Sequence, residues 1–135
     1  HGCLVGSEMC IRDRVEAALR RAGATRSVSP GWMHHSDRGS QYTSHRYQEQ
    51  LRSMGAVVSM SRKGNCWDNA PVESFFGTLK QELLHRQTWS GLNAVRAAVS
   101  DYIHNFYNPV RIHAHNHNVS PIHAELDFNH KQRVA

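Results

Sequence analysis

The sequence is poor in cysteine and contains no long apolar run. Its three cysteines, Cys3, Cys10 and Cys66, show no paired spacing among the 135 residues. We therefore expect reduced cysteines without a disulfide framework, as in a protein of the cytoplasm. No apolar stretch approaches the roughly 20 residues needed to cross a bilayer, so the sequence predicts neither a membrane span nor export.

Acidic residues are outnumbered by basic ones. The chain has 16 Lys and Arg against 11 Asp and Glu, which gives a formal net charge of +5 and a pI near 9.5. This excess favours a polyanionic partner. With 39% hydrophobic and 20% charged residues, and no internal repeat or low-complexity tract, the composition excludes disorder throughout and suits one domain or part of one.

The first 14 residues differ in character from the rest. Residues 4–14 resemble the in-frame translation of a transposon-end adapter used to prepare DNA for sequencing. We therefore predict that residues 1–14 are a non-native segment, which does not bear on the fold. The alternative is a genuine short strand over residues 3–5, followed by the start of a helix. On the adapter interpretation, the native part begins near Val15.

Helical and strand patterns alternate between residues 15 and 60. In the second helix, Tyr47, Leu51 and Met54 should face inward, and Gly55 should end it. In the first strand, Trp32 and His34 share one face and Met33 and His35 the other. We expect, in order, a helix over residues 15–23, a linker over residues 25–30, a buried strand over residues 31–36, a helix over residues 44–54 and a strand over residues 56–60.

Asp37 directly follows the first predicted strand. Gly39 allows the chain a sharp exit two residues later, and Ser44 is suited to cap the next helix. An acid at the carboxyl end of a strand occupies the usual place of an active-site group on an open α/β sheet. Asp37 is therefore a candidate site residue.

A second acid, Glu73, lies one turn inside another predicted helix, which extends to about residue 85. Asp68 or Asn69 is the expected N-cap, and Pro71 suits the first turn. Glu73 and Lys80 share a face, although this spacing is equally typical of a solvated polar surface. The apolar residues that recur at helical spacing are Val72, Phe75, Phe76, Leu79 and Leu83.

Three motifs accompany this pair of acids, and 35 residues lie between Asp37 and Glu73. The motifs span residues 35–44, 60–70 and 72–76. Together they resemble the insertion-sequence transposases whose catalytic core is similar to that of retroviral integrases. The resemblance implies an α/β fold of the ribonuclease H-like class, with residues 15–107 as a partial catalytic core and residues 108–135 as a C-terminal helical tail.

The resemblance also implies a chemistry. Asp37 and Glu73 match the second and third members of the family's acidic triad, which binds two Mg²⁺ or Mn²⁺ ions. Carboxylate oxygens are suitable ligands, and such ions activate a nucleophile and neutralise charge during phosphodiester cleavage. The implied reaction is cleavage at a transposon end followed by transfer to target DNA, by a homo-oligomer in the bacterial cytoplasm.

The first acid of the triad is missing. In the family it lies on a strand well before the motif around Asp37, but between residue 14 and Asp37 the only acid is Glu16, on a predicted helix. Asp13 belongs to the adapter-like segment and lies too close to Asp37. We therefore predict an incomplete core without its first strands, which shows little or no strand transfer by itself.

Basic residues near Glu73 are candidates for DNA binding. Arg62, Lys63 and Asn65, with Gly64, form a loop suited to clamp a phosphate backbone, although a solvated turn is the plain alternative. The family match places Lys80 near DNA, with surface charge as its alternative. Arg111 and His113 are expected either to contact phosphate or to fix the tail to the core.

Several aromatic, sulfur and imidazole side chains are expected to be structural. Trp67 suits base stacking but is more typical of a core, and Cys66 suits a small buried site. His34 and His35 are expected to pack beside Asp37. Histidines 113, 115 and 117 alternate, but one native cysteine and no second ligand pair make a zinc site a poor interpretation.

The remaining segments are predicted to be helical with an irregular connection. A helix over residues 92–107, with Val95, Val99, Tyr102, Ile103 and Phe106 at three- and four-residue steps, should end at Pro109. A short helix is expected over residues 121–128, and residues 131–135 should be frayed.

Three other functions remain open at this stage. One is a DNA-binding or oligomerising transposase remnant without catalysis. A second is another ribonuclease H-like nuclease, such as a junction resolvase. The third is a binding module for a partner other than nucleic acid, which predicts that any affinity for DNA is insensitive to salt.

Overall fold

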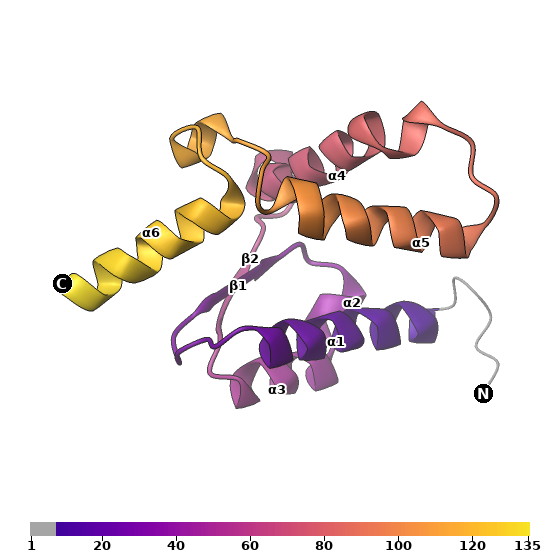
Figure 1. Cartoon of the computed structure of the whole chain (residues 1–135). Coiled ribbons are helices and arrows are strands. Elements are labelled where there is room, and N and C mark those ends of the chain that lie inside the picture. Colours follow the sequence, from indigo (N-terminus) through magenta and orange to yellow (C-terminus); the bar gives the residue numbers. More distant parts are fainter. Residues whose placement is uncertain (1–7) are drawn as a thin grey trace. The chain divides into compact units, whose positions relative to one another are not determined.

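The computed structural model describes residues 8–135 and divides into two compact units. The first unit ends at Glu73, and the second comprises Ser74–Ala135. Figure 1 traces the elements of both. The alternative strand over residues 3–5 lies outside the described residues, as do the first seven residues of the adapter-like segment.

The first helix, α1, spans Glu8–Thr25 and is longer than the expected residues 15–23. Residues 8–14 contain neither glycine nor proline, so nothing in them breaks a helix that continues upstream. Cys10 is buried and disulfide-bonded, which contradicts the expectation of wholly reduced cysteines. Spacing along a sequence does not show which residues approach in space, and a disulfide depends on that approach.

Two parallel strands form the sheet of the first unit. Strand β1 spans Met33–Ser36 and β2 spans Val57–Met60, in a register that pairs Met33 with Val57 and Ser36 with Met60. Parallel strands need a crossover, which is supplied by α2 at Ser40–Thr43 and α3 at His45–Ser53. Figure 1 shows the two strands side by side, with α1, α2 and α3 grouped beside them. The order of helices and strands in this unit matches the predicted helix–strand–helix–strand order, except that the one-turn helix α2 was not expected.

The core of this unit lies between α1, α3 and one face of the sheet. Leu51 is fully buried at 0% exposure, and Leu19 and Tyr47 are nearly so. The predicted inward face of α3 is thus confirmed. Partly buried residues that pack against this cluster are Val15, Trp32, Tyr42, Met54 and Ala56.

The other face of the sheet is exposed. Met33 and Val57, which pair across it, keep 67% and 51% of their surface in contact with solvent. The expectation of a buried strand is therefore wrong for this face, because only the side of Trp32 and His34 packs on helices. The strand also begins later than predicted, since Gly31 turns the chain at a φ of +94°.

A one-turn 3-10 helix at Cys66–Asn69 leads directly into α4, Ala70–Glu82. Asn69 directly precedes α4, as expected of an N-cap, and its side chain accepts a hydrogen bond from Ser61, while Asp68 accepts hydrogen bonds from Arg62. Asn65 provides the cap of the 3-10 turn, since its side chain accepts from the backbone N–H of Trp67. The last expected turn of α4 is instead a 3-10 turn at Leu84–Arg86.

In the second unit, α5 spans Leu92–Asp101 and continues as a π-helical segment, Tyr102–Tyr107. Backbone bonds five residues apart, such as Asn108 N–H to the Ile103 carbonyl, define the wider turns. The predicted 3.6-residue period therefore fails here. Phe106, one of the residues at these steps, is 41% exposed, and Tyr107 packs edge-on against Phe75 at 5.0 Å.

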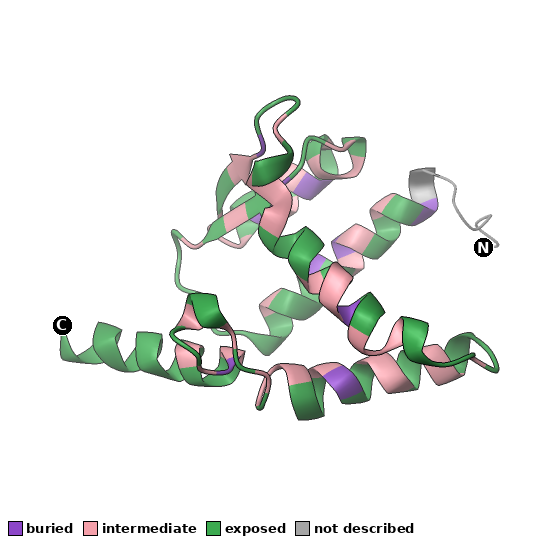
Figure 2. Ribbon diagram, turned by 90° about the horizontal axis from the view of Figure 1, so that it is seen from above, coloured by how far each residue is buried: buried purple, intermediate pink, exposed green. Residues whose placement is uncertain are grey.

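The tail is more regular than predicted. A 3-10 turn at Ala114–Asn116 precedes α6, Pro121–Val134, whose N-cap is Ser120. The expectation of a short helix with frayed residues 131–135 is wrong. No glycine or proline follows Phe128, and Lys131 and Arg133 in the last turn complement the helix dipole. Figure 2 shows α6 exposed over most of its length. Within residues 8–135, no helix has the length and apolar character of a membrane span.

Candidate functional site

The two predicted acids line one cleft in the first unit. Asp37 leaves the carboxyl end of β1, and Glu73 lies in the first turn of α4. The cleft has a volume of about 480 Å³. Its other lining residues are Arg38, Ser61, Arg62, Lys63, Gly64, Asn65, Cys66 and Asn69.

A close turn holds the Asp37 side chain. One of its carboxylate oxygens, Oδ1, accepts the backbone N–H of Gly39 at 2.7 Å. A Cβ atom at Gly39 would lie 2.9 Å from that oxygen and 2.7 Å from the Gln41 side chain. Gly39 has a φ of −57°, which any residue adopts, so a larger residue here would have to displace the ends of the Asp37 and Gln41 side chains. The second carboxylate oxygen, Oδ2, accepts no backbone hydrogen bond within this turn.

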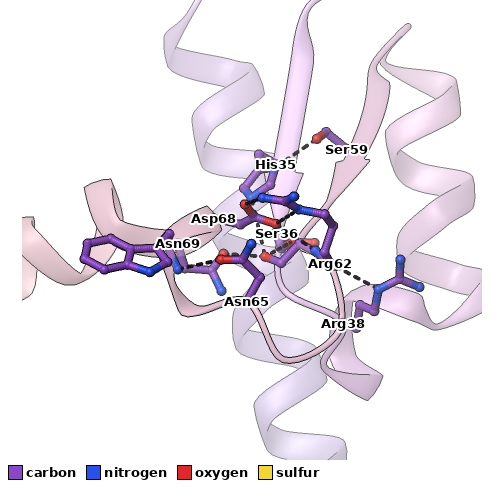
Figure 3. Close-up of polar contacts among 10 residues, drawn as sticks. His35, Ser36, Arg38, Ser59, Arg62, Asn65, Asp68 and Asn69 are labelled. Carbon is purple, nitrogen blue, oxygen red and sulfur yellow. Dashed lines mark hydrogen bonds and ion pairs between the residues drawn. The ribbon is translucent and has the colours of Figure 1, made fainter.

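A buried serine links the elements that carry the two acids. Ser61 is only 4% exposed, and its backbone N–H donates a hydrogen bond to the carbonyl of Ser36, the last residue of β1, at 2.9 Å. Its hydroxyl donates to Oδ1 of Asn69, the residue before α4, at 2.6 Å. Arg38 Nε donates to the Ser61 carbonyl at 2.8 Å. These bonds, drawn in Figure 3, fix the end of β1 to the start of α4.

An ion pair closes the basic loop. Arg62 reaches both carboxylate oxygens of Asp68, with Nη2 at 3.0 Å and Nε at 3.2 Å. The hydrogen bonds from Arg62 lower the pKa of Asp68 to about 2, and the same pair raises the pKa of Arg62. The charge of Arg62 is thus balanced within its own loop, as Figure 3 shows. Lys63 is exposed and makes no ion pair within residues 8–135.

The paired histidines are structural, as predicted. His34 Nε2 lies 2.9 Å from the Tyr47 hydroxyl, and burial lowers the pKa of His34. Burial also raises the pKa of Tyr47 to about 12. His35 Nδ1 lies 2.9 Å from the Ser59 hydroxyl on the neighbouring strand. Both side chains therefore brace the sheet behind Asp37.

Glu16 does not belong to this cleft. It is 3% exposed on α1, and its carboxylate pairs with Arg46 of α3 at 3.0 Å. The pair attaches α1 to α3, in agreement with the prediction that Glu16 lies on the wrong element to replace the missing acid.

The remaining DNA-binding candidates, Lys80 and Arg111, belong to the second unit and line no part of the cleft. Lys80 is exposed on α4. Arg111 donates to Glu82 through Nη2 at 2.9 Å and Nε at 3.0 Å, and its guanidinium lies 5.8 Å from the Tyr107 ring centre. This geometry favours the alternative in which Arg111 anchors the tail.

Glu82 is the centre of that anchor. Hydrogen bonds from Arg111 and then from the Tyr102 hydroxyl lower the pKa of Glu82. Burial, followed by the bond to Glu82, raises the pKa of Tyr102 to about 12. His113 packs edge-on against Tyr107 at 5.0 Å, and burial lowers its pKa.

Two expectations about the 3-10 turn are wrong. The sequence favours a core position for Trp67 and a buried one for Cys66, but the Trp67 side chain is 81% exposed and Cys66 is an exposed free thiol. A turn of four residues is too short for its sequence to show which side faces inward. Sequence reasoning also missed the structural roles of Ser61 and Asp68. A serine directly after a strand and an Arg–Asp spacing of six are too common to signal them.

The donor chemistry of the cleft suits a hard cation. Mg²⁺ is usually held by one or two carboxylates together with water and substrate phosphate oxygens. Asp37 and Glu73 would supply two such carboxylates. In residues 8–135, no group of three or more His, Cys, Asp or Glu side chains is arranged to hold a metal ion.

Comparisons with known proteins agree with this architecture. Two family profiles, both described as "Integrase core domain", match residues 2–66 and residues 73–125. The catalytic core domain of BIV integrase has a TM-score of 0.65 at 18% identity, covering 90% of this chain and 75% of that chain. The likeness confirms the expected ribonuclease H-like fold, here with a two-stranded sheet.

Similar sequences come from bacterial insertion elements. The uncharacterized 31 kDa protein of insertion element IS600 from Shigella sonnei is 47% identical over 73% of this chain, and the IS904 transposase from Lactococcus lactis is 48% identical over 63%. The putative transposase InsK of IS150 from Escherichia coli is 41% identical over 86%. The chain spans only 37%, 34% and 41% of the lengths of these relatives. Together with the two profiles and the fold, they show that the chain belongs to the insertion-sequence transposases with an integrase-like core.

Proposed function

We propose that the chain carries the second and third acids of a transposase active site that cleaves DNA at transposon ends and transfers it to a target. The observation that carries this proposal is the cleft lined by both Asp37, from the end of β1, and Glu73, from the start of α4. Membership of the family supports it, since several relatives are named as transposases of insertion sequences.

In this proposal, Asp37 and Glu73 hold Mg²⁺ or Mn²⁺, with two ions in the intact family site. The bound metal would supply charge neutralisation at a scissile phosphate. Lys63 and Asn65 hold the DNA backbone beside it, and Arg62 keeps the loop closed through Asp68. Lys80 contacts a phosphate elsewhere on the DNA.

The fragment itself is proposed to bind DNA without joining it. Residues 15–135 offer two acids of the expected three, Asp37 and Glu73. The intact protein would act as a homo-oligomer in the bacterial cytoplasm. Mg²⁺-dependent joining of transposon ends by this chain alone would contradict the proposed inactivity.

Metal binding provides the direct test. Free Mn²⁺ would be counted by electron paramagnetic resonance during titration of the purified chain. Glu73→Gln and Asp37→Asn should each weaken binding by at least about tenfold, which is the loss expected for one direct ligand. Asp127→Asn, an exposed acid on α6, serves as the matched control. Unchanged Mn²⁺ binding by the double variant at Asp37 and Glu73 would overturn the proposal.

A DNA titration separates the rival functions. Affinity for a linear duplex should fall steeply with salt, because phosphate contacts release counterions. Two results together would favour a non-catalytic remnant: the parent chain binds no metal, and the variants Asp37→Asn and Glu73→Gln still bind DNA. Preference for four-way junctions over linear ends would favour a resolvase, and binding insensitive to salt would favour a module with another partner.

A further inference from the structure

Three tryptophans occupy different environments. The indole N–H of Trp32 donates to the Met54 carbonyl at 3.0 Å, and that of Trp89 donates to the Leu84 carbonyl at 3.0 Å. Trp67 has no such bond and no ring contact within residues 8–135. At 81%, its exposure is also the largest among the exposed large hydrophobic residues of that range. Trp67 thus contributes nothing to the core.

The backbone beneath this ring is held firmly. The backbone N–H of Trp67 donates a hydrogen bond to Asn65 Oδ1 at 3.0 Å. The next residue, Asp68, forms an ion pair with Arg62, and Asn69 accepts a hydrogen bond from the Ser61 hydroxyl. Each of the three residues around Trp67 is therefore engaged within the loop. An aromatic side chain on a fixed turn loses little conformational freedom when it binds.

The surroundings indicate the partner. Asn65 and Cys66, the two residues before Trp67, line the cleft that contains Asp37 and Glu73. Lys63 on the same cleft is a cation without an ion pair in the described part of the chain. An exposed aromatic ring beside a cation that can contact phosphate is a combination that holds unpaired bases, since the ring stacks on a base while the cation contacts the backbone.

We propose that Trp67 stacks on an unpaired base at a DNA end whose adjoining phosphate lies in the cleft. This inference rests on the proposed function, because it needs DNA in that cleft. It adds a specificity: the chain should distinguish a frayed end, where a base is free to stack, from continuous duplex, where every base is already stacked.

The test compares three labelled DNAs in EDTA, so that metal binding plays no part. They are a duplex with a short single-stranded 3′ overhang, the blunt duplex and a closed circular duplex. Trp67→Ala should weaken binding of the overhang by about 5- to 150-fold, the range expected for one stacked base. Binding of the circle should change by less than about twofold. Trp67→Phe, which retains a ring, should keep most of the affinity.

Two controls make the outcome decisive. Phe128→Ala removes another exposed aromatic, at 61% exposure on α6, and should leave all three affinities unchanged. Circular dichroism should show no loss of fold in Trp67→Ala, because the side chain packs on little. Overhang binding that is equal in Trp67→Ala and the parent would overturn the stacking role alone. A parent chain that binds none of the three DNAs would likewise overturn the stacking role, while the Mn²⁺ titration remains the separate test of the proposed function.

Discussion

The two units are stabilised in different ways. The first contains an apolar cluster around Leu51, which is 0% exposed, while its polar loop at residues 61–66 lines the cleft. In the second, a carboxylate lies between an arginine and a phenol, so that Glu82 connects α4, the π-helical segment and the tail. Lys63 in the first unit is thus exposed at the cleft, whereas Arg111 in the second is engaged by Glu82.

This difference shows that a basic residue in a sequence is not by itself evidence of a cation available to bind phosphate. Lys63 and Arg111 look alike in a sequence scan for phosphate-binding residues. Lys63 has no ion pair in residues 8–135, but Arg111 makes three hydrogen-bond contacts with Glu82 between 2.9 and 3.1 Å. The pairing of an arginine, rather than its presence, decides whether it is free to bind a ligand.

The largest effect should come from the apolar core. Leu51→Ala removes a fully buried side chain and should lower the free energy of unfolding of the first unit by about 2–5 kcal/mol. Hydrogen exchange measured by mass spectrometry should show lost protection in peptides before Glu73 and little change after it. Val57→Ala, at a residue 51% exposed, is the control and should have little effect. Equal loss of protection in both units would refute the comparison.

A smaller effect should follow from Glu82→Gln. The substitution keeps the shape but removes the charge that Arg111 and Tyr102 share, at an expected cost of about 1.5–3 kcal/mol. Protection should be lost in peptides of the second unit. The pKa of Tyr102, about 12 in the parent, should fall, which ultraviolet titration measures. Asp127→Asn should change neither quantity. A Tyr102 pKa that stays unchanged would show that Glu82 is not its partner.

The smallest effect concerns the exposed pair in the loop. Because Arg62 lowers the Asp68 pKa from 3.8 to about 2, the pair stabilises the fold at pH values above 3.8. That contribution should be lost as the pH falls from 3.8 towards about 2. Carbon NMR of the Asp68 carboxyl reports its titration directly. In Arg62→Gln the midpoint should move up towards 3.8, while an unmoved midpoint would contradict the pairing.

The sequence predicted the site better than its surroundings. The strand end at Asp37, the cap at Ser44 and the buried face of Tyr47 and Leu51 follow from local patterns, which is why they were confirmed. The shared cleft followed from the motif spacing of the family. The assignments of Asp37 and Glu73 as metal ligands stay predictions.

What sequence reasoning missed depends on contacts between distant residues or on short turns. Arg111 and Glu82 are 29 residues apart, so no periodic pattern shows their pairing. The exposure of Trp67 depends on how a single 3-10 turn is tied by Asn65. The extent of α6 was underestimated because residues at a chain end were expected to fray, whereas no glycine or proline interrupts the helix after Phe128.

The π-helical segment has a consequence for reading this chain against its relatives. Its turns are wider than those of an α-helix and hold about one extra residue per turn. Tyr102 and Tyr107, five residues apart in the sequence, have ring centres 5.9 Å apart. Such a bulge is how a helix tolerates a single-residue insertion without unfolding. A helical wheel with 3.6 residues per turn drawn through Tyr102–Tyr107 would therefore place the side chains of this segment in the wrong directions.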